Sequence, residues 1–218
     1  LMTTLLISKA LNDYAEHFTT PESKELAALN RETNLKRGDA VMLSGHLQGA
    51  LLQLLSKMAR PKRILEIGTY TGYSAICLAA GLQEGGLLHT IEVDEELYDI
   101  ADKYITATGY REKIVQHTGA AAAVIAQLDE VFDMVFIDAD KANYGLYYDL
   151  VFDKLPVGGY IIADNVLYDG EVVLPANEQS KNARAISAFN QKVKADNRVE
   201  HMLLPVRDGL MVVRKIRE

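Results

Sequence analysis

The sequence predicts an α/β fold built on a mostly parallel sheet, and two observations support this class. From residue 63 onward, short apolar segments alternate regularly with helical stretches, which is the pattern of strands linked by helices. The strand segments are continuously apolar, so each should be buried on both faces. A parallel sheet with helices on both of its faces satisfies both observations.

The elements of this region are predicted in order. Candidate strands cover residues 64–67, 87–93, 113–116, 132–137 and 160–163. Helical stretches separate them at residues 73–80, 95–108, 120–128 and 143–154. After a loop at 166–177, a helix over 181–194 leads into two strands, 199–205 and 209–215. The short link between these last two strands makes them antiparallel neighbours.

Three helices are predicted before the first strand. The first has an apolar face at helical spacing, formed by Ile7, Leu11, Tyr14 and Phe18. Thr20-Pro21-Glu22 has the pattern of a helix start, and a third helix runs from near Val41 to just before Pro61. These helices either cover one end of the domain or present apolar surface to a second subunit. We therefore expect a single domain over 1–218, with N-terminal helices in 1–60 and the core in 61–218.

Composition narrows the class of protein. No apolar run approaches the ~20 residues that a membrane span needs, and the apolar run at residues 5–7 is too short for a signal peptide. The single cysteine, Cys77, lies in an apolar run, which favours a core residue and a reducing compartment. A net charge of −7 without a dense Lys/Arg stripe gives no general attraction to nucleic acid. We expect a cytoplasmic protein with no membrane partner.

A glycine turn follows the first predicted strand. Gly68 and Gly72 are spaced Gly-x-x-x-Gly and precede a helix, an arrangement in which a ligand can contact backbone amides. The spacing differs from the Gly-x-Gly-x-x-Gly of dinucleotide-binding folds, and a turn without a ligand fits it equally well. Glu92 stands about 20 residues beyond Gly72, where an acid can accept both hydroxyls of a ribose. The alternative is a surface acid beside Asp94, itself the N-cap of the next helix.

Polar residues gather at the carboxyl ends of the predicted strands. They are Glu66, Gly68, Glu92, Asp94, Asp138, Asp140, Asp164 and Asn165. If the fourth and fifth strands are neighbours, their ends lie only ~5 Å apart, and Asp138, Asp164 and Asn165 converge. Such oxygen ligands suit Mg²⁺, with Mn²⁺ or Ca²⁺ as alternatives, although an Asp/Asn pair can also simply cap a turn. Lys141 would act there as a base, steer an anion, or remain a solvated lysine.

Several motifs occur together in a fixed order over most of the chain. They are Leu65-Glu66-Ile67-Gly68-Thr69-Tyr70-Thr71-Gly72-Tyr73-Ser74, Ile137-Asp138-Ala139-Asp140-Lys141-Ala142-Asn143-Tyr144, Ala163-Asp164-Asn165-Val166-Leu167, Pro175-Ala176-Asn177 and Asp208-Gly209-Leu210. Together they resemble the cation-dependent class I O-methyltransferases, the family that includes caffeoyl-coenzyme A and catechol O-methyltransferases.

The resemblance implies a Rossmann-like sheet of order 3-2-1-4-5-7-6 and, in many members, a homodimer. It implies a divalent cation on Asp138, Asp164 and Asn165, with Lys141 and Asp138 as catalytic residues. It also implies an S-adenosylmethionine site, with Met42 and Ser44 joining from the third helix. The full set is Met42, Ser44, Glu66, Gly68, Thr69, Ser74, Glu92, Gly119, Ala121, Asp138, Asp140 and Tyr147.

Departures from the family pattern bear on the methyl acceptor. Tyr168 stands where plant members usually have Trp, Glu171 where Arg is common, and the loop that grips a coenzyme A ester has no clear counterpart. These differences favour a small catechol-like phenol over a plant-type ester. Methylation of a hydroxylated base in tRNA is an alternative. Two readings of other classes are a nicotinamide dehydrogenase and a non-catalytic cofactor-binding module.

Overall fold

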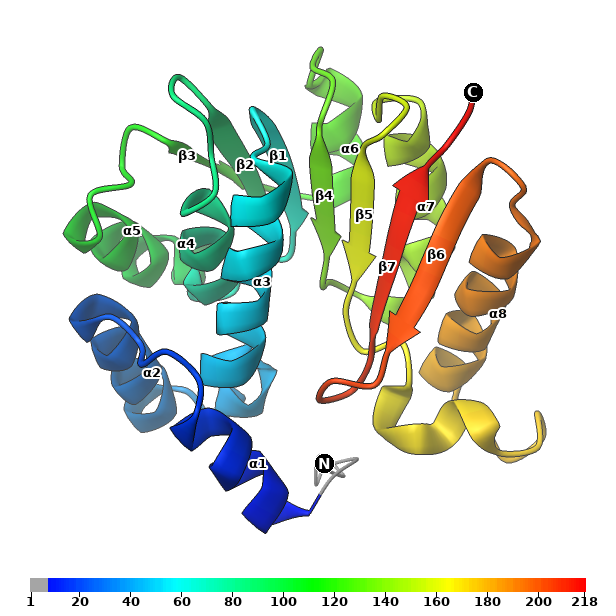
Figure 1. The fold of residues 1–218 in the computed structure, drawn as a ribbon, viewed down its shortest axis with the longest axis horizontal. Helices are drawn as coiled ribbons and strands as arrows, with labels where there is room; N and C mark the ends of the chain where they lie inside the picture. Colours follow the sequence, from blue (N-terminus) through cyan, green and yellow to red (C-terminus); the bar gives the residue numbers. More distant parts are fainter. Residues whose placement is uncertain (1–7) are drawn as a thin grey trace. The chain divides into compact units, whose positions relative to one another are not determined.

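The computed structural model describes residues 8–218, which form two compact units, residues 8–124 and 125–218. Ile7, expected on the first helix, and the apolar run at 5–7 lie outside the described residues. The sheet has the strand order β3-β2-β1-β4-β5-β7-β6 (Figure 1). The predicted strand order is therefore confirmed.

The first unit contains three parallel strands of the sheet. β1 (Arg63–Ile67) pairs with β2 (Leu87–Glu92), and β2 pairs with β3 (Ile114–Thr118). Its helices are α1 (Lys9–His17), α2 (Lys24–Lys36), α3 (Gly45–Ala59), α4 (Tyr73–Ala79) and α5 (Tyr98–Ala107), with short 3-10 segments η1 (Ala40–Met42) and η2 (Glu95–Leu97). Every residue of α4 is buried, because this helix packs against α3, β1 and β2.

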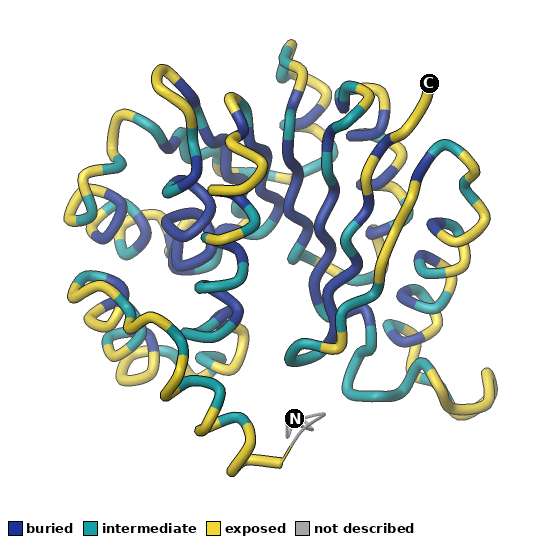
Figure 2. Tube along the Cα trace, viewed as in Figure 1, coloured by how far each residue is buried: buried dark blue, intermediate teal, exposed yellow. Residues whose placement is uncertain are grey.

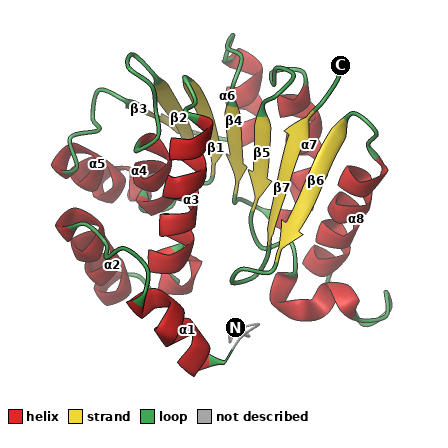
Figure 3. Ribbon diagram, viewed as in Figure 1, coloured by secondary structure: helices red, strands yellow, loops and turns green. Residues whose placement is uncertain are grey.

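The second unit contains a mixed four-stranded part of the sheet. β4 (Met134–Ile137) pairs in parallel with β5 (Tyr160–Ala163), and β7 (Leu210–Lys215) lies antiparallel to both β5 and β6 (Val199–Leu204). The remaining elements are η3 (Lys141–Asn143), α7 (Tyr144–Phe152), η4 (Tyr168–Val173) and α8 (Lys181–Ala195). A further helix, α6 (Ala121–Gln127), contains the boundary between the units. Figure 3 shows the strands and helices by type.

Several predicted boundaries were wrong, each for a local reason. The second helix does not start at Thr20-Pro21-Glu22, because the Ser23 side chain accepts the Leu26 amide and caps the helix there. The predicted third helix divides into η1 and α3, so Met42 lies in a 3-10 turn and Ser44 is the N-cap of α3. The expected loop at 166–177 contains η4. The predicted N-cap at Asp94 is confirmed, since its Oδ1 accepts the Glu96 amide.

The N-terminal helix presents apolar side chains to solvent. Leu11, Tyr14 and Phe18 on or next to α1 are each about two-thirds exposed, and Figure 2 shows this helix largely as exposed. A second subunit covering these helices stays a prediction. None of the helices within residues 8–218 is long and apolar enough to cross a membrane.

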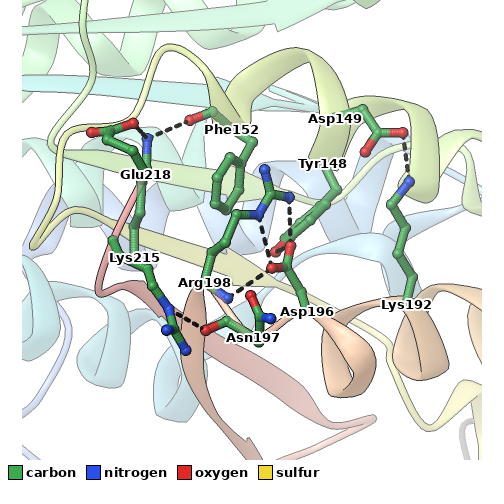
Figure 4. Close-up of polar contacts among 10 residues, drawn as sticks. Tyr148, Asp149, Phe152, Lys192, Asp196, Asn197, Arg198, Lys215 and Glu218 are labelled. Atoms are coloured by element: carbon green, nitrogen blue, oxygen red, sulfur yellow. Dashed lines mark hydrogen bonds and ion pairs between the residues drawn. The ribbon is translucent and has the colours of Figure 1, made fainter.

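A polar cluster ties α7 to the strands β6 and β7 in the second unit (Figure 4). Asp196 accepts hydrogen bonds from the Tyr148 hydroxyl at 2.9 Å and from Nε and Nη2 of Arg198 at 2.9 and 2.7 Å. The Arg198 guanidinium lies 3.8 Å from the centroid of the Phe152 ring, and the Lys215 ammonium lies 4.8 Å from it. Phe152 is therefore held between two cations, an arrangement that adds cation–π attraction to its burial.

The Asp196 carboxylate gives this cluster a defined pH dependence. Hydrogen bonding to Arg198 lowers its pKa in the folded protein, so its contribution to stability is present above the unfolded value of about 4 and is lost as the pH falls. We expect Asp196→Asn to lower the free energy of unfolding by about 1–2 kcal/mol at pH 7, because half-exposed Arg198 is partly screened by water. Urea unfolding should show this difference shrinking below pH 4.

Asp149→Asn is the matched control, because its ion pair with Lys192 lies at the surface, with side chains 56% and 39% exposed. It should leave stability nearly unchanged. An Asp196→Asn effect that is equally large at pH 7 and pH 3 would contradict the role of the carboxylate charge.

Candidate functional site

The glycine turn of the first unit connects β1 to α4. The amides of Gly68 and Thr69 donate to Ile91 O, which fastens the turn to the end of β2. Gly72 has φ +88°, and a Cβ there would lie 3.4 Å from Ala101 Cβ. The left-handed backbone conformation therefore favours glycine at this position, while a Cβ would make only an ordinary contact with α5.

A pocket lies beside this turn within the first unit. The empty space between its walls, counted together with open solvent, is about 210 Å³. Its walls come from the glycine turn, the end of β2, the start of α5 and the end of β3: Thr69, Tyr70, Glu92, Asp94, Leu97, Tyr98, Ala101, Gln116, His117 and Thr118. These are the carboxyl ends of parallel strands, where ligands of open α/β sheets bind.

Backbone amides fix the Glu92 carboxylate at this pocket. Oε2 accepts the Tyr70 amide at 2.8 Å, while Oε1 accepts the amides of Val93 and Asp94 at 2.9 and 3.0 Å. An ionised carboxylate has about two lone-pair sites on each oxygen, so the two amides at Oε1 occupy that oxygen and one site remains at Oε2. One ribose hydroxyl can therefore be accepted at Oε2 without loss of an amide contact, and binding of both hydroxyls by Glu92 stays a prediction.

The other residues predicted to bind the cofactor in this unit differ in their place relative to the pocket. Thr69 lines it, while Met42, Ser44, Glu66, Gly68, Ser74, Gly119 and Ala121 do not form its walls. Glu66 is fully buried in β1, and its Oε2 accepts the Thr90 hydroxyl at 2.6 Å. The Gly119 amide donates to Glu92 O at 2.8 Å. Glu66 thus links β1 to β2 through Thr90. Direct binding of the cofactor by these residues stays a prediction.

Tyr70 was missed by the sequence analysis, although it has a central place in the turn. It has φ +48°, its amide contacts Glu92, and its hydroxyl donates to Asp39 Oδ1 at 2.8 Å. Arg37 pairs with both oxygens of Asp39, which lowers the pKa of Asp39 to about 2, while burial and Asp39 raise the pKa of Tyr70 to about 12. The segment before η1 is therefore fastened to the glycine turn.

The second unit brings Asp138 and Asp164 to neighbouring strand ends. In the β4–β5 register Ile137 is opposite Ala163, and the Asp164 amide donates to Ile137 O at 2.9 Å. Asp138 and Asp164 each follow these paired residues directly, as the sequence predicted. Asn165 comes next with φ +55°, a left-handed conformation that turns its side chain away from the path of an extended strand.

Lys141 lies against the same acids. Its Nζ donates to Asp138 Oδ1 at 3.0 Å and to the Tyr144 hydroxyl at 2.7 Å. Burial by itself lowers the pKa of the ammonium, but the contacts with Tyr144 and Asp138 outweigh this effect and raise the pKa overall. Lys141 is therefore a charged, partly buried group and not the solvated lysine that sequence reasoning left open.

Two loops hold Asn165 from the side of β7. The Val166 amide donates to Gly209 O, and the Leu167 amide to Asp208 O at 2.9 Å. Asp208 accepts the Asp169 amide at 2.7 Å and a hydrogen bond from the Asn165 side chain. Burial raises the pKa of Asp208. Asp208 therefore belongs to this site, although the motif Asp208-Gly209-Leu210 alone assigned it no function.

The donor chemistry of this cluster suits a hard divalent cation. Asp138, Asp164 and Asn165 offer only oxygen ligands, as Mg²⁺ prefers. Within residues 8–218, no three His, Cys, Asp or Glu side chains are grouped so that they could hold a metal ion. Asp140 lies nearby in the chain and accepts the Tyr147 hydroxyl at 2.5 Å.

Comparison with known proteins assigns the chain to a family. A family model for O-methyltransferases matches residues 15–216. The chain belongs to the O-methyltransferase family. Caffeoyl-CoA O-methyltransferase 5 of Nicotiana tabacum is 34% identical over 224 residues, which cover 97% of this chain and 93% of the tobacco protein.

Solved structures agree with this family. The Bacillus cereus O-methyltransferase in complex with SAH is 32% identical with a TM-score of 0.83, over 94% of this chain and 97% of that chain. The O-methyltransferase TomG of Streptomyces achromogenes in complex with SAM is 26% identical with a TM-score of 0.86, over 95% of this chain and 96% of that chain. The protein is thus an O-methyltransferase with a Rossmann-like fold, and the dehydrogenase and non-catalytic alternatives do not hold.

The loop that carries Asn165 depends on Gly209. This glycine has φ +85°, and a Cβ there would lie 2.6 Å from Leu167 Cγ and 3.2 Å from the Leu167 nitrogen. Gly170 has a similar φ of +80° in the same loop but no neighbour within 4 Å of its ideal Cβ. We expect Gly209→Ala to lower the free energy of unfolding by about 1–3 kcal/mol more than Gly170→Ala, measured by urea denaturation. If both variants lose the same free energy of unfolding, the contact with Leu167 does not contribute to stability.

Proposed function

We propose that this O-methyltransferase transfers a methyl group from S-adenosylmethionine to one hydroxyl of a small catechol-like phenol, with the help of a divalent cation. The observation that carries the proposal is the placement of Asp138 and Asp164 at neighbouring strand ends beside Lys141. Relatives crystallised with SAM or SAH add support for the cofactor.

The first unit is suited to holding the nucleoside part of the cofactor. S-adenosylmethionine supplies the methyl group on a sulfonium, and the protein contributes chiefly orientation and electrostatics. Glu92 would accept a ribose hydroxyl at Oε2, since three backbone amides already fix its carboxylate in place. The glycine turn would let the rest of the cofactor approach the backbone.

The second unit is suited to binding the acceptor. A divalent cation bound by Asp138, Asp164 and Asn165 would supply the charge that lowers the pKa of a vicinal hydroxyl. Lys141 is paired with Asp138 as an ammonium, so we propose that it steers the acceptor oxygen and balances its negative charge while the proton passes to water. This assigns Lys141 an electrostatic function and not that of a base.

The loop after Asn165 favours a small, uncharged acceptor. It carries Asp169 and Glu171, where a binder of coenzyme A phosphates would need cations. Glu171 is also engaged, because its Oε2 accepts the Ser180 amide at 3.0 Å at the start of α8. These acids would repel the phosphates of a coenzyme A ester but not a neutral phenol.

Activity measurements test the proposal as a whole. With S-adenosylmethionine and Mg²⁺, we expect methylation of catechols, loss of turnover in EDTA, and recovery when Mg²⁺ is restored. Asp164→Ala should reduce turnover at least about 100-fold while the Kd for S-adenosylmethionine, measured by calorimetry, stays unchanged. Unmodified tRNA is tested in parallel. Normal turnover in EDTA would contradict cation dependence, and methylation of tRNA alone would replace the phenol.

Two substitutions at Lys141 separate charge from proton transfer. If the ammonium acts by its charge, Lys141→Arg should keep part of the kcat, whereas Lys141→Met should lose about 100-fold or more. If Lys141 instead removes the proton, Arg is as poor as Met because a guanidinium does not deprotonate. The kcat of both variants at pH 7.5 therefore decides the function of this residue, and equal losses would contradict an electrostatic function.

A further inference from the structure

Tyr144 is a fully buried tyrosine whose hydroxyl lies among the predicted catalytic groups. It is the first residue of α7, and its exposed fraction is 0%. Its hydroxyl accepts the Lys141 ammonium at 2.7 Å. The same hydroxyl is 3.0 Å from Asp164 O and 3.3 Å from Ile137 O, to which it donates. One phenol oxygen thus joins Lys141 to the backbone at the ends of β4 and β5.

The position of this hydroxyl is fixed from the other end of the side chain. The Tyr144 ring meets Phe189 of α8 edge to face, with centroids 5.5 Å apart. A side chain enclosed in this way has little rotational freedom, so its oxygen stays where the fold places it. Of the two carbonyls that it contacts, one belongs to the last residue of β4 and the other to Asp164, the residue that follows β5 and whose amide is bonded to Ile137 O.

The Lys141 ammonium donates hydrogen bonds to Asp138 and to Tyr144, and these two partners differ in what else they bind. Asp138 is also a predicted cation ligand, so its carboxylate is shared between the ammonium and the cation. The Tyr144 hydroxyl is not a predicted cation ligand, and its proton is donated to backbone carbonyls. When the acceptor and cation are bound, the phenol is therefore the partner that can keep the ammonium in the same place.

We propose that Tyr144 is a positioning residue that sets the location of the Lys141 ammonium relative to Asp164. The inference rests on the proposed function of Lys141, but the contact itself is independent of any activity. Without the hydroxyl, the flexible lysine stem would be held by Asp138 alone. Misplacement of a group by about 1 Å can cost about 100-fold in rate. Loss of the hydrogen bond from Lys141 to Tyr144 should therefore lower kcat more than it lowers the affinity for substrate.

Tyr148 offers a matched control on the same helix. It is also 0% exposed, and its hydroxyl donates to Asp196 at 2.9 Å, in the cluster drawn in Figure 4 and not at Lys141. Tyr144→Phe and Tyr148→Phe remove the same atom from equally buried rings. A general effect of losing a buried hydroxyl in α7 would appear in both variants, whereas an effect on Lys141 would appear only in the first.

The experiment measures the lysine and the reaction separately. In ¹H–¹⁵N spectra of lysine ammonium groups, the Lys141 signal is identified by its absence in Lys141→Arg. We expect this signal in the wild type and in Tyr148→Phe, and its loss through faster exchange in Tyr144→Phe. With S-adenosylmethionine, Mg²⁺ and a catechol, Tyr144→Phe should lose about 10- to 100-fold in kcat with KM and the Kd for S-adenosylmethionine nearly unchanged.

An unchanged Lys141 signal or an unchanged kcat in Tyr144→Phe overturns the proposal, and so does an equal fall in Tyr148→Phe. If the wild type methylates no acceptor, the proposed function fails, and the Lys141 signal alone decides on Tyr144. If Tyr144→Phe does not fold, the wild-type spectrum decides: a nuclear Overhauser contact between the Lys141 ammonium and the Tyr144 ring supports the proposal, and its absence overturns it.

Discussion

The hydrogen bond from the Asp164 amide to Ile137 O is the interaction on which the proposed acceptor site depends. It continues the parallel pairing of β4 and β5 by one residue and so sets Asp138 beside Asp164. A shift of one residue in this register would turn alternate side chains to the opposite face and separate the two carboxylates. The buried strands on either side make such a shift costly, which is why two short strands can define a site.

Backbone atoms fix polar side chains in each of the two units. Tyr144 contacts two strand-end carbonyls, and Glu92 in the first unit accepts three amides. Because the backbone of paired strands and tight turns moves little, these contacts fix charged and polar atoms before a ligand arrives. Preorganisation of this kind is what a transfer reaction needs, since the protein's main contribution is to orient the reacting groups.

Much of this arrangement could be predicted from the sequence, because strand ends in a parallel sheet share one edge. That rule placed Asp138, Asp164 and Glu92 correctly without coordinates. Glu66 stands one residue before the end of β1 and is fully buried, and its contact with the cofactor stays a prediction. Tyr144 was missed because an aromatic residue at the start of an apolar helix has the pattern of a core residue.

Other contacts could not be predicted, because nothing in a single sequence pairs distant residues. Asp39 and Tyr70 are joined by a hydrogen bond across a separation of 31 residues, and Asp169 and Asp208 across 39. Both contacts join loops whose conformations include positive φ values at non-glycine residues. Sequence patterns describe helices and strands better than such loops, since these conformations are stabilised by tertiary contacts.

The central claim is that the acids at the ends of β4 and β5 bind a divalent cation. The most direct measurement is an anomalous difference map from crystals of the protein grown with Mn²⁺. The account predicts one strong peak in contact with the carboxylates of Asp138 and Asp164 and the amide oxygen of Asn165. It would be contradicted by no peak there, or by a peak only at the acids that line the surface hollow near Asp129, Asp149 and Asp153.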